Sequence, residues 1–176
     1  AAYALYVLAR AGRVDRSRLR YMHDERLDQI DSPLALAQLG AALHLIGDRA
    51  RSQSAFDAAE AAIGYENPGD WYQSSRRDLA GLVAYAAEVG DADRVARLAE
   101  RVVADLPEPA RLTTQEKAFL LMAAQGLSGG ADAIVIDSPL SAVNGERPVF
   151  RVAPDMLDQP LVFTTSGTGP VWVTQL

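Results

Sequence analysis

The stretch TTQEKAFLLMAA, residues 113–124, indicates what kind of fold this chain adopts. Thr113 followed by Glu116 is the pattern of a capping box, in which each side chain bonds the backbone N–H of the other residue where a helix begins. Residues 118–124 then carry no polar side chain. Because this run makes about two helical turns, every face of the helix is apolar, and we expect neighbouring elements to bury it on both sides.

Four apolar runs of this kind occur along the chain, and a glycine follows each of them. The runs are AAYALYVLA (1–9), LALAQLGAALHLI (34–46), LAGLVAYAA (79–87) and AFLLMAA (118–124), and the glycines are Gly12, Gly47, Gly90 and Gly126. A glycine just past a helix commonly takes the left-handed conformation that ends it, because it has no Cβ. We therefore predict four apolar helices, each ended by its glycine.

A second, amphipathic kind of helix is predicted after the glycines. The clearest lies in GDADRVARLAERVVADL, residues 90–106, where Asp91 is placed to cap the helix. Its apolar stripe has the i, i+3, i+4, i+7 spacing and comprises Ala92, Val95, Leu98, Ala99, Val102, Val103 and Leu106. Its polar face comprises Arg94, Arg97, Glu100 and Arg101.

The two other copies of this helix are predicted at 47–63 and 12–27. The first has Asp48 as its cap and Phe56, Ala59 and Ile63 on its buried stripe, and the second, weaker copy buries Leu19 and Met22. Apolar and amphipathic helices thus alternate, which places the first kind inside and the second outside with its charges in water. Short glycine turns make consecutive helices antiparallel, so the predicted fold class is mainly α, with antiparallel helical hairpins in two layers.

Two architectures fit this pattern: an open helical solenoid, or an α/α toroid that closes on itself. The glycines are 35, 43 and 36 residues apart, which disfavours a regular tetratricopeptide array. The stretch LGAALHLIGDRARSQSAFDAA, residues 39–59, is nevertheless similar to one such repeat. A tetratricopeptide-like interaction scaffold therefore stays open as an alternative function.

The pattern changes to strands after Gly129 and Gly130. Isoleucine and valine at 134–136 favour a strand, and Asn144-Gly145 is a strong hairpin signal because both turn positions need a positive φ. The turn SGTG, residues 166–169, predicts a second hairpin. We expect two domain parts, a helical part at 1–128 and a β part at 131–176 with about four short strands that need a partner layer.

Composition excludes several classes of function. The chain has 176 residues, 49% of them hydrophobic, which suffices for a core. Its net charge of −6 argues against a nucleic-acid partner, since there is no basic excess to neutralise phosphates. It has no cysteine, so thiolate chemistry and disulfides are excluded within it. The chain also lacks an apolar run long enough to predict a membrane-spanning helix.

Candidate metal ligands are few and poorly spaced. The only histidines are His23 and His44, and we expect His44 to be structural because no second ligand stands at a metal-binding spacing from it. The stretch HDERLDQID contains the carboxylates Asp24, Glu25, Asp28 and Asp31. Asp24 and Asp28 share a helix face and could clamp Mg²⁺, but the surrounding arginines favour a solvated surface instead.

The stretch GDWYQSSRRDLAG, residues 69–81, is the densest group of functional side chains. It contains Trp71, Tyr72, Ser74, Ser75, Arg77 and Asp78. No histidine lies near in the sequence to activate a serine, so we interpret the stretch as a helix start that Ser74 or Ser75 caps, with Arg77 holding the loop. We accordingly expect a non-enzymatic chain with no catalytic, cofactor-binding or metal-binding residues.

Three stretches, in order, resemble the later helices of the thioester domain of bacterial alpha-2-macroglobulins. They are YALYVLARAG (3–12), WYQSSRRDLAGLVAYAAEVGD (71–91) and LTTQEKAFLLMAA (112–124). The segments PVFRV (148–152) and QPLVFTTSGTGPVWVTQL (159–176) are similar to the strands that follow that domain. The resemblance implies that 1–128 is part of an α/α toroid and that 131–176 is part of the CUB-like β-sandwich into which the toroid is inserted.

The same resemblance implies a broad-spectrum inhibitor that traps proteases when cleavage of a bait region releases a reactive thioester. The family's thioester residues, a Cys and a Gln, lie in a C-x-E-Q motif that this chain does not contain. The chain begins inside an apolar run and ends in a strand-like run, so we expect it to be a fragment of a larger polypeptide. The implied partners are target proteases, met through the full-length parent, and the parent's remaining domains.

Two further expectations concern assembly and location. The strands at 131–176 carry more apolar surface than two hairpins can bury, so we expect fast amide exchange there or self-association through these strands. The resemblance also implies a periplasmic location, with the parent anchored in the inner membrane. An α/α-toroid enzyme that uses the carboxylates at 24–31 is a third function class, weakened because paired acids are absent from the apolar helices.

Overall fold

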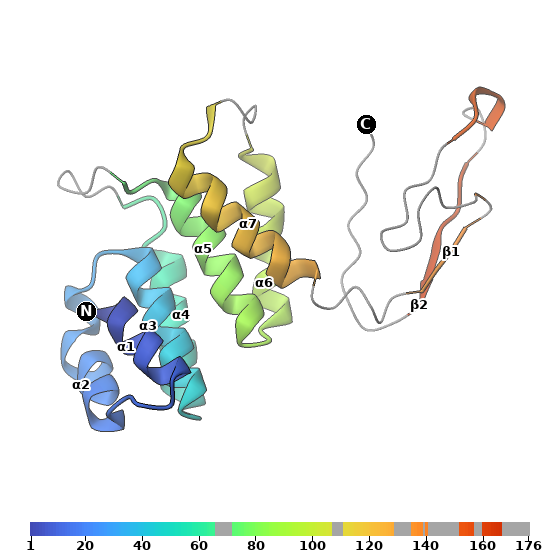
Figure 1. Cartoon of the computed structure of the whole chain (residues 1–176). Coiled ribbons are helices and arrows are strands. Elements are labelled where there is room, and N and C mark those ends of the chain that lie inside the picture. The colour runs from blue at the N-terminus through green and yellow to red at the C-terminus, as the bar shows by residue number, and fades with distance from the viewer. Residues whose placement is uncertain are drawn as a thin grey trace. The chain divides into compact units, whose positions relative to one another are not determined.

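The structure is a computed structural model that describes residues 1–65, 72–106, 111–128, 135–138, 140, 152–156 and 160–166. The chain divides into two compact units, Ala1–Ser128 and Gly129–Leu176 (Figure 1). Each unit is described by itself. None of the helices in these described ranges is long and apolar enough to cross a membrane.

The first unit consists of seven α-helices and one described short 3-10 helix. They are α1 (Ala2–Arg10), α2 (Arg16–Arg26), η1 (Leu27–Gln29), α3 (Pro33–Leu45), α4 (Arg49–Ala61), α5 (Ser75–Glu88), α6 (Ala92–Ala104) and α7 (Thr114–Ser128). Side chains cap several starts: Asp15, Ser32, Ser74 and Asp91 each accept a hydrogen bond from a backbone N–H of the first turn. Asp48 precedes α4 without such a bond, because its carboxylate binds Arg20 and Arg51 instead.

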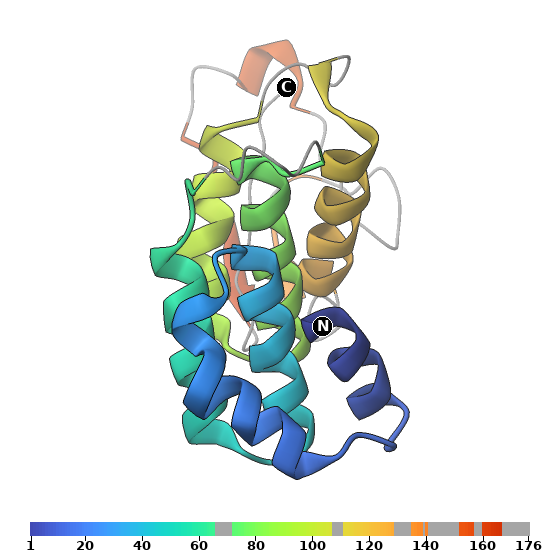
Figure 2. The same ribbon diagram turned by 90° about the vertical axis from the view of Figure 1, so that its left-hand side faces the viewer.

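The helices form the two layers that the alternating pattern predicts. Helices α1, α3, α5 and α7 pack in this order as an inner row, while α2, α4 and α6 pack outside α3 and α5. Figures 1 and 2 show α1 and α7 on the same side of α3 and α5, so the inner row is curved. The prediction of antiparallel hairpins in two layers is confirmed.

Glycine turns connect the inner helices to the outer ones at one end of the unit, the lower end in Figure 2. Gly12, Gly47 and Gly90 have φ angles of 66°, 82° and 75°, which a residue with a Cβ rarely adopts. The fourth predicted terminator is wrong, since Gly126 lies inside α7. A Cβ at that position would come within 2.7 Å of the Cβ of Ala87, so Gly126 lets α7 approach α5 closely.

Burial differs along the inner row. Almost every residue of α3 between Leu36 and Leu43, and of α5 between Arg77 and Ala86, is buried. In contrast, α1 and α7 are buried on one face only. Their exposed large apolar residues are Tyr3, Val7, Leu8, Leu121 and Met122, which we call the inner apolar face. The expectation that 118–124 is covered on both sides is therefore wrong within this chain, because no described helix packs on that side of α7.

The outer helix α6 also departs from its predicted stripe. Val95, Leu98, Ala99 and Val102 are buried as expected, but Ala92, Val103 and Leu106 are exposed and Arg94 is buried. The helix is thus rotated toward Arg94, whose guanidinium finds acidic partners on α4. In α4, Phe56 and Ala59 are fully buried, and Ile63, just after the end of this helix, is partly buried.

Helices α3 and α4 approach closely where Gly40 faces the ring of Phe56. A Cβ on Gly40 would lie 2.9 Å from the nearest ring carbon, and that ring is fully buried. We expect Gly40→Val to lower the free energy of unfolding by about 1–3 kcal/mol, because the ring has no space into which it can move. Urea denaturation measures this, with Ala50→Val at an exposed position of α4 as the control for adding a valine to a helix; a Gly40→Val variant as stable as the wild type would contradict the packing.

The second unit contains one described strand pair and a short 3-10 helix, η4 (Pro154–Met156). Strand β1 (Val135–Asp137) pairs antiparallel with β2 (Thr164–Ser166), with Ile136 opposite Thr165. The strands are distant in sequence, so this pair is not one of the predicted hairpins. The turns predicted at Asn144-Gly145 and at 167–169, and the remaining two of the four expected strands, lie outside the described residues.

Candidate functional site

A buried charged pair lies at the start of α5, within the stretch 69–81 that contains the densest group of functional side chains in the sequence. Arg77 donates to Asp78 Oδ1 through Nε (2.9 Å) and Nη2 (2.7 Å), and Asp78 is only 1% exposed. Arg77 also donates to the carbonyl oxygen of Tyr72 at 2.8 Å. The predicted role of Arg77 in holding the loop is confirmed, and of the two candidate serines Ser74 is the cap. Trp71 lies outside the described residues.

Glu116 ties the start of α7 to the start of α5. One carboxylate oxygen accepts the backbone N–H of Thr113 at 2.8 Å, which with the reciprocal Thr113 bond completes the predicted capping box. The other oxygen accepts from Ser74 Oγ at 2.9 Å and from Arg76 at 3.0 Å. Burial would raise the pKa of Glu116, but these hydrogen bonds lower it below the usual 4.5.

The lowered pKa of Glu116 predicts how its contribution to the free energy of unfolding depends on pH. Its stabilisation is fully present above the unfolded-state pKa near 4.5 and is lost as the pH falls through the lower folded-state pKa. We expect Glu116→Gln to cost about 1–2 kcal/mol at pH 7 and progressively less as the pH falls below 4.5. Urea denaturation across this range tests it, with exposed Glu100→Gln as the control. A cost that stays constant with pH would contradict the role of the charge.

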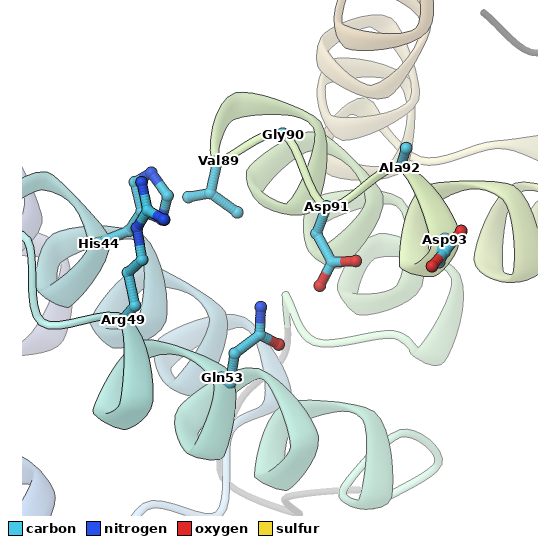
Figure 3. A pocket seen from close by; sticks show the side chains of 8 residues that line it. All are labelled: His44, Arg49, Gln53, Val89, Gly90, Asp91, Ala92 and Asp93. Carbon is cyan, nitrogen blue, oxygen red and sulfur yellow. The ribbon is translucent and has the colours of Figure 1, made fainter.

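A pocket lies between two neighbouring glycine turns, at the lower end of the helical unit. It encloses about 500 Å³ and is lined by His44, Arg49, Gln53, Val89, Gly90, Asp91, Ala92 and Asp93. Figure 3 shows His44 and Arg49 together on one wall, with Asp91 and Asp93 on the opposite wall. The pocket is therefore polar, with a cationic side from the α3–α4 turn and an anionic side from the α5–α6 turn.

Arg94 binds two of the residues that line this pocket, Asp91 and Gln53. Its guanidinium binds Asp91 at 3.0 Å, Asp57 at 2.7 Å and Gln53 at 3.1 Å. The same group lies over the ring of Phe56, 5.5 Å from its centroid. Asp91 is thus held both as the cap of α6 and as a partner of Arg94, whose charge it shares with Asp57 and Glu60.

The carboxylates at 24–31 do not converge on a metal site. Both oxygens of Asp24 accept from Arg51, at 2.8 and 2.9 Å, and one of them lies 2.9 Å from His23 Nδ1. These bonds hold the pKa of Asp24 well below its usual range. No group of three or more metal-ligating side chains is present among the residues that the structure describes.

Sequence reasoning found the local parts of these clusters and missed the long-range ones. Ser74, Arg77 and Thr113 act on residues within five positions, which helix-start patterns reveal. The contacts from Glu116 to α5 and from Arg94 to α4 join residues about forty positions apart. The signal available for Arg94 was its place at i+3 from the cap Asp91, a spacing at which the two side chains can meet.

Similarity to curated proteins is confined to part of the chain. The chain is 40% identical over 86 residues, 47% of its length, to the alpha-2-macroglobulins of two strains of Xylella fastidiosa. It spans only about 5% of the length of these relatives. No protein-family model matches the chain.

Similarity to solved structures extends over most of the chain. A mutant of Salmonella alpha-2-macroglobulin matches 96% of the chain with 30% identity and a TM-score of 0.61, and the chain covers 11% of that structure. The native conformation of Escherichia coli alpha-2-macroglobulin matches 96% of the chain with 27% identity and a TM-score of 0.63, again over 11% of that structure. Sequence and fold agree on the relationship: the chain belongs to the alpha-2-macroglobulin family.

Proposed function

We propose that the chain is part of a bacterial alpha-2-macroglobulin-like inhibitor that traps proteases. The observation that carries the proposal is the match of 94–96% of the chain to Salmonella alpha-2-macroglobulin structures at 30–31% identity. Because the chain covers only 11% of those structures, inhibition belongs to the parent polypeptide. The chain's own task is then structural, as one section of the inhibitor.

The inner apolar face supports a place inside a larger helical domain. Tyr3 and Leu121 are each 61% exposed, although the runs 1–9 and 118–124 that contain them have no charged side chain. Patches of this kind usually mark surfaces that another element covers. We propose that further helices of the parent pack on α1 and α7 and complete an α/α toroid of the thioester-domain type, with the second unit as part of a CUB-like sandwich.

An enzymatic role is not part of the proposal. The chain has no cysteine, and the buried polar groups at the starts of α5 and α7 bond one another in helix caps and ion pairs. Their geometry serves to hold helix ends together. A family thioester, if the parent carries one, must come from residues beyond this sequence, because the motif requires a cysteine.

The tetratricopeptide-like scaffold is less well supported by the packing. A scaffold of that kind binds peptides along a concave surface lined by its inner helices. Here α3 and α5, the central inner helices, are buried along nearly their whole length. The exposed inner residues are instead large and apolar, as in an interface within one polypeptide.

Protease inhibition by the parent tests the proposal. Trypsin is incubated with a molar excess of the parent, and cleavage of casein is then followed. The parent should slow cleavage, whereas the 176-residue chain alone should leave the rate unchanged. An inactive parent at saturating excess would overturn the inhibitor function, and an active isolated chain would overturn the structural role.

The location of the parent is proposed from the same family resemblance. We place it in the periplasm, anchored in the inner membrane by a part of the polypeptide outside this sequence. Cell fractionation with an antibody against the helical unit distinguishes this from a cytoplasmic protein. Recovery of the parent with cytoplasmic markers would contradict the assignment.

A further inference from the structure

The end of the helical unit that carries the glycine turns bears an excess of arginine. Three turns meet there, at Gly12, Gly47 and Gly90 (lower end in Figure 2). Two of its arginines have internal partners: Arg10 pairs with Glu88 at 3.7 Å, and Arg20 with Asp48 at 3.1 Å. We call the remaining exposed set, Arg13, Arg16, Arg18 and Arg49, the arginine rim.

The guanidinium groups of the arginine rim have little internal neutralisation. None of the four forms a hydrogen bond or ion pair with a residue in the described part of the chain. One neighbouring acid, Asp15, interacts electrostatically with Arg18, while its carboxylate accepts hydrogen bonds from the backbone and hydroxyl of Ser17. This local positive surface contrasts with the chain's net charge of −6.

The positions of these arginines oppose local helix stability. Arg16 and Arg18 lie in the first turn of α2, and Arg49 is the first residue of α4. The macrodipole makes a helix N-terminus positive, so carboxylates are favoured there and cations disfavoured. Neither first turn contains an acidic residue. The N-cap residues Asp15 and Asp48 offset part of this cost, and positions that remain locally unfavourable are typical of residues that serve binding.

The pocket in Figure 3 contains side chains that are able to bind a single carboxylate. Arg49 and His44 stand together on its cationic wall, and a guanidinium fork matches a carboxylate through two parallel hydrogen bonds. The opposite wall presents Asp93, whose carboxylate has no partner among the described residues, and Asp91, which is paired with Arg94. A uniformly anionic surface would be repelled by Asp93, whereas a peptide can place one acidic side chain at Arg49 and another group at Asp93.

We propose that the arginine rim and this pocket form a docking surface for an acidic protein segment, with Arg49 and His44 binding one of its carboxylates. The surface is open and polar, unlike the mostly apolar, enclosing sites of small molecules. Contact at such a surface is governed by charge complementarity, which weakens as salt screens it. This docking function does not depend on protease inhibition by the parent.

Fluorescence anisotropy of a labelled tetraglutamate peptide, titrated with the 176-residue chain, tests the proposal. The wild type should bind at low ionic strength and release the peptide as salt is added. Arg16→Glu combined with Arg49→Glu should weaken binding by about tenfold or more. The same variant should be at least as stable as the wild type, because both substitutions place carboxylates at helix N-termini. Thermal unfolding of both proteins measures this, so a loss of binding by a variant as stable as the wild type reports on the docking surface itself.

A control double variant changes the net charge by the same amount at positions outside the arginine rim and the pocket. Arg101→Glu combined with Arg111→Glu alters exposed arginines near the other end of the unit and should leave peptide affinity within about twofold. Equal weakening by the two double variants would overturn the proposal, as would failure of the wild type to bind the peptide. Binding to phosphatidylglycerol vesicles without binding to the peptide would assign the surface to a membrane and also overturn it.

Discussion

Replacing Arg77 with alanine should lower the free energy of unfolding of the helical unit by about 3–5 kcal/mol. Asp78 is only 1% exposed, and both of its hydrogen bonds from a cation come from Arg77. Removing the guanidinium leaves a buried carboxylate that keeps a hydrogen bond from the neutral amide of Gln73, at 3.1 Å, and loses its cation. Removing one partner of a buried ion pair lowers the free energy of unfolding by about 3–5 kcal/mol because the remaining charge stays desolvated.

The matched control for Arg77→Ala is Arg97→Ala on α6. Arg97 also forms an ion pair, with Glu60 at 3.2 Å, but its side chain is 57% exposed. Exposed pairs contribute at most about 1 kcal/mol, so this variant should unfold close to the wild type in urea. Equal losses for the two variants would show that Arg77 has no special structural role at the start of α5.

Ala84→Asp should be the second strongly destabilising change, at about 3 kcal/mol or more. Ala84 is buried in α5 on the side where Gly126 lets α7 approach, and Gly126 lies close to its carbonyl oxygen. A carboxylate placed there loses its hydration. The larger side chain would also separate α5 from α7. Thermal unfolding followed by circular dichroism measures the loss.

Arg97→Asp introduces the same residue on the solvent side and serves as the comparison. The substitution removes an exposed pair and adds a like charge near Glu60, so the cost should stay within about 1 kcal/mol. Similar melting temperatures for Ala84→Asp and Arg97→Asp would contradict the assignment of α5 to the inner row and α6 to the outer layer.

Local chemistry explains how much of the fold is visible in the sequence. The caps Ser74, Asp91 and Thr113 act within three residues, so their patterns identify the helix starts correctly. Gly12, Gly47 and Gly90 end helices for a reason intrinsic to glycine, its tolerance of positive φ. The alternation of apolar and amphipathic helices follows from burial on two faces or on one.

The predictions from the sequence are wrong where contacts between distant residues determine the conformation or burial of a residue. A local rule cannot distinguish Gly126, which permits close helix packing, from a helix-ending glycine. The sequence pattern assigns Arg94 to the exposed polar face of its helix. In the structure Arg94 is buried and pairs with Asp57 and Glu60 of α4. The pocket is invisible for the same reason, since its walls come from two turns more than forty residues apart. The composition of 118–124 predicted burial on both faces, and the second face remains open in this chain.

That open face provides the most direct test of the central claim, that α1 and α7 are inner helices of a larger alpha-2-macroglobulin domain. Leu121 is 61% exposed in the chain, so Leu121→Asp should change the free energy of unfolding of the isolated chain by less than about 0.5 kcal/mol. In the parent polypeptide the same carboxylate would be buried against further helices and should cost about 3 kcal/mol or more. Hydrogen exchange of α7 amides in both proteins measures the two values. A large loss in the parent and a small one in the isolated chain is the predicted result, and an equally small loss in both would contradict the account.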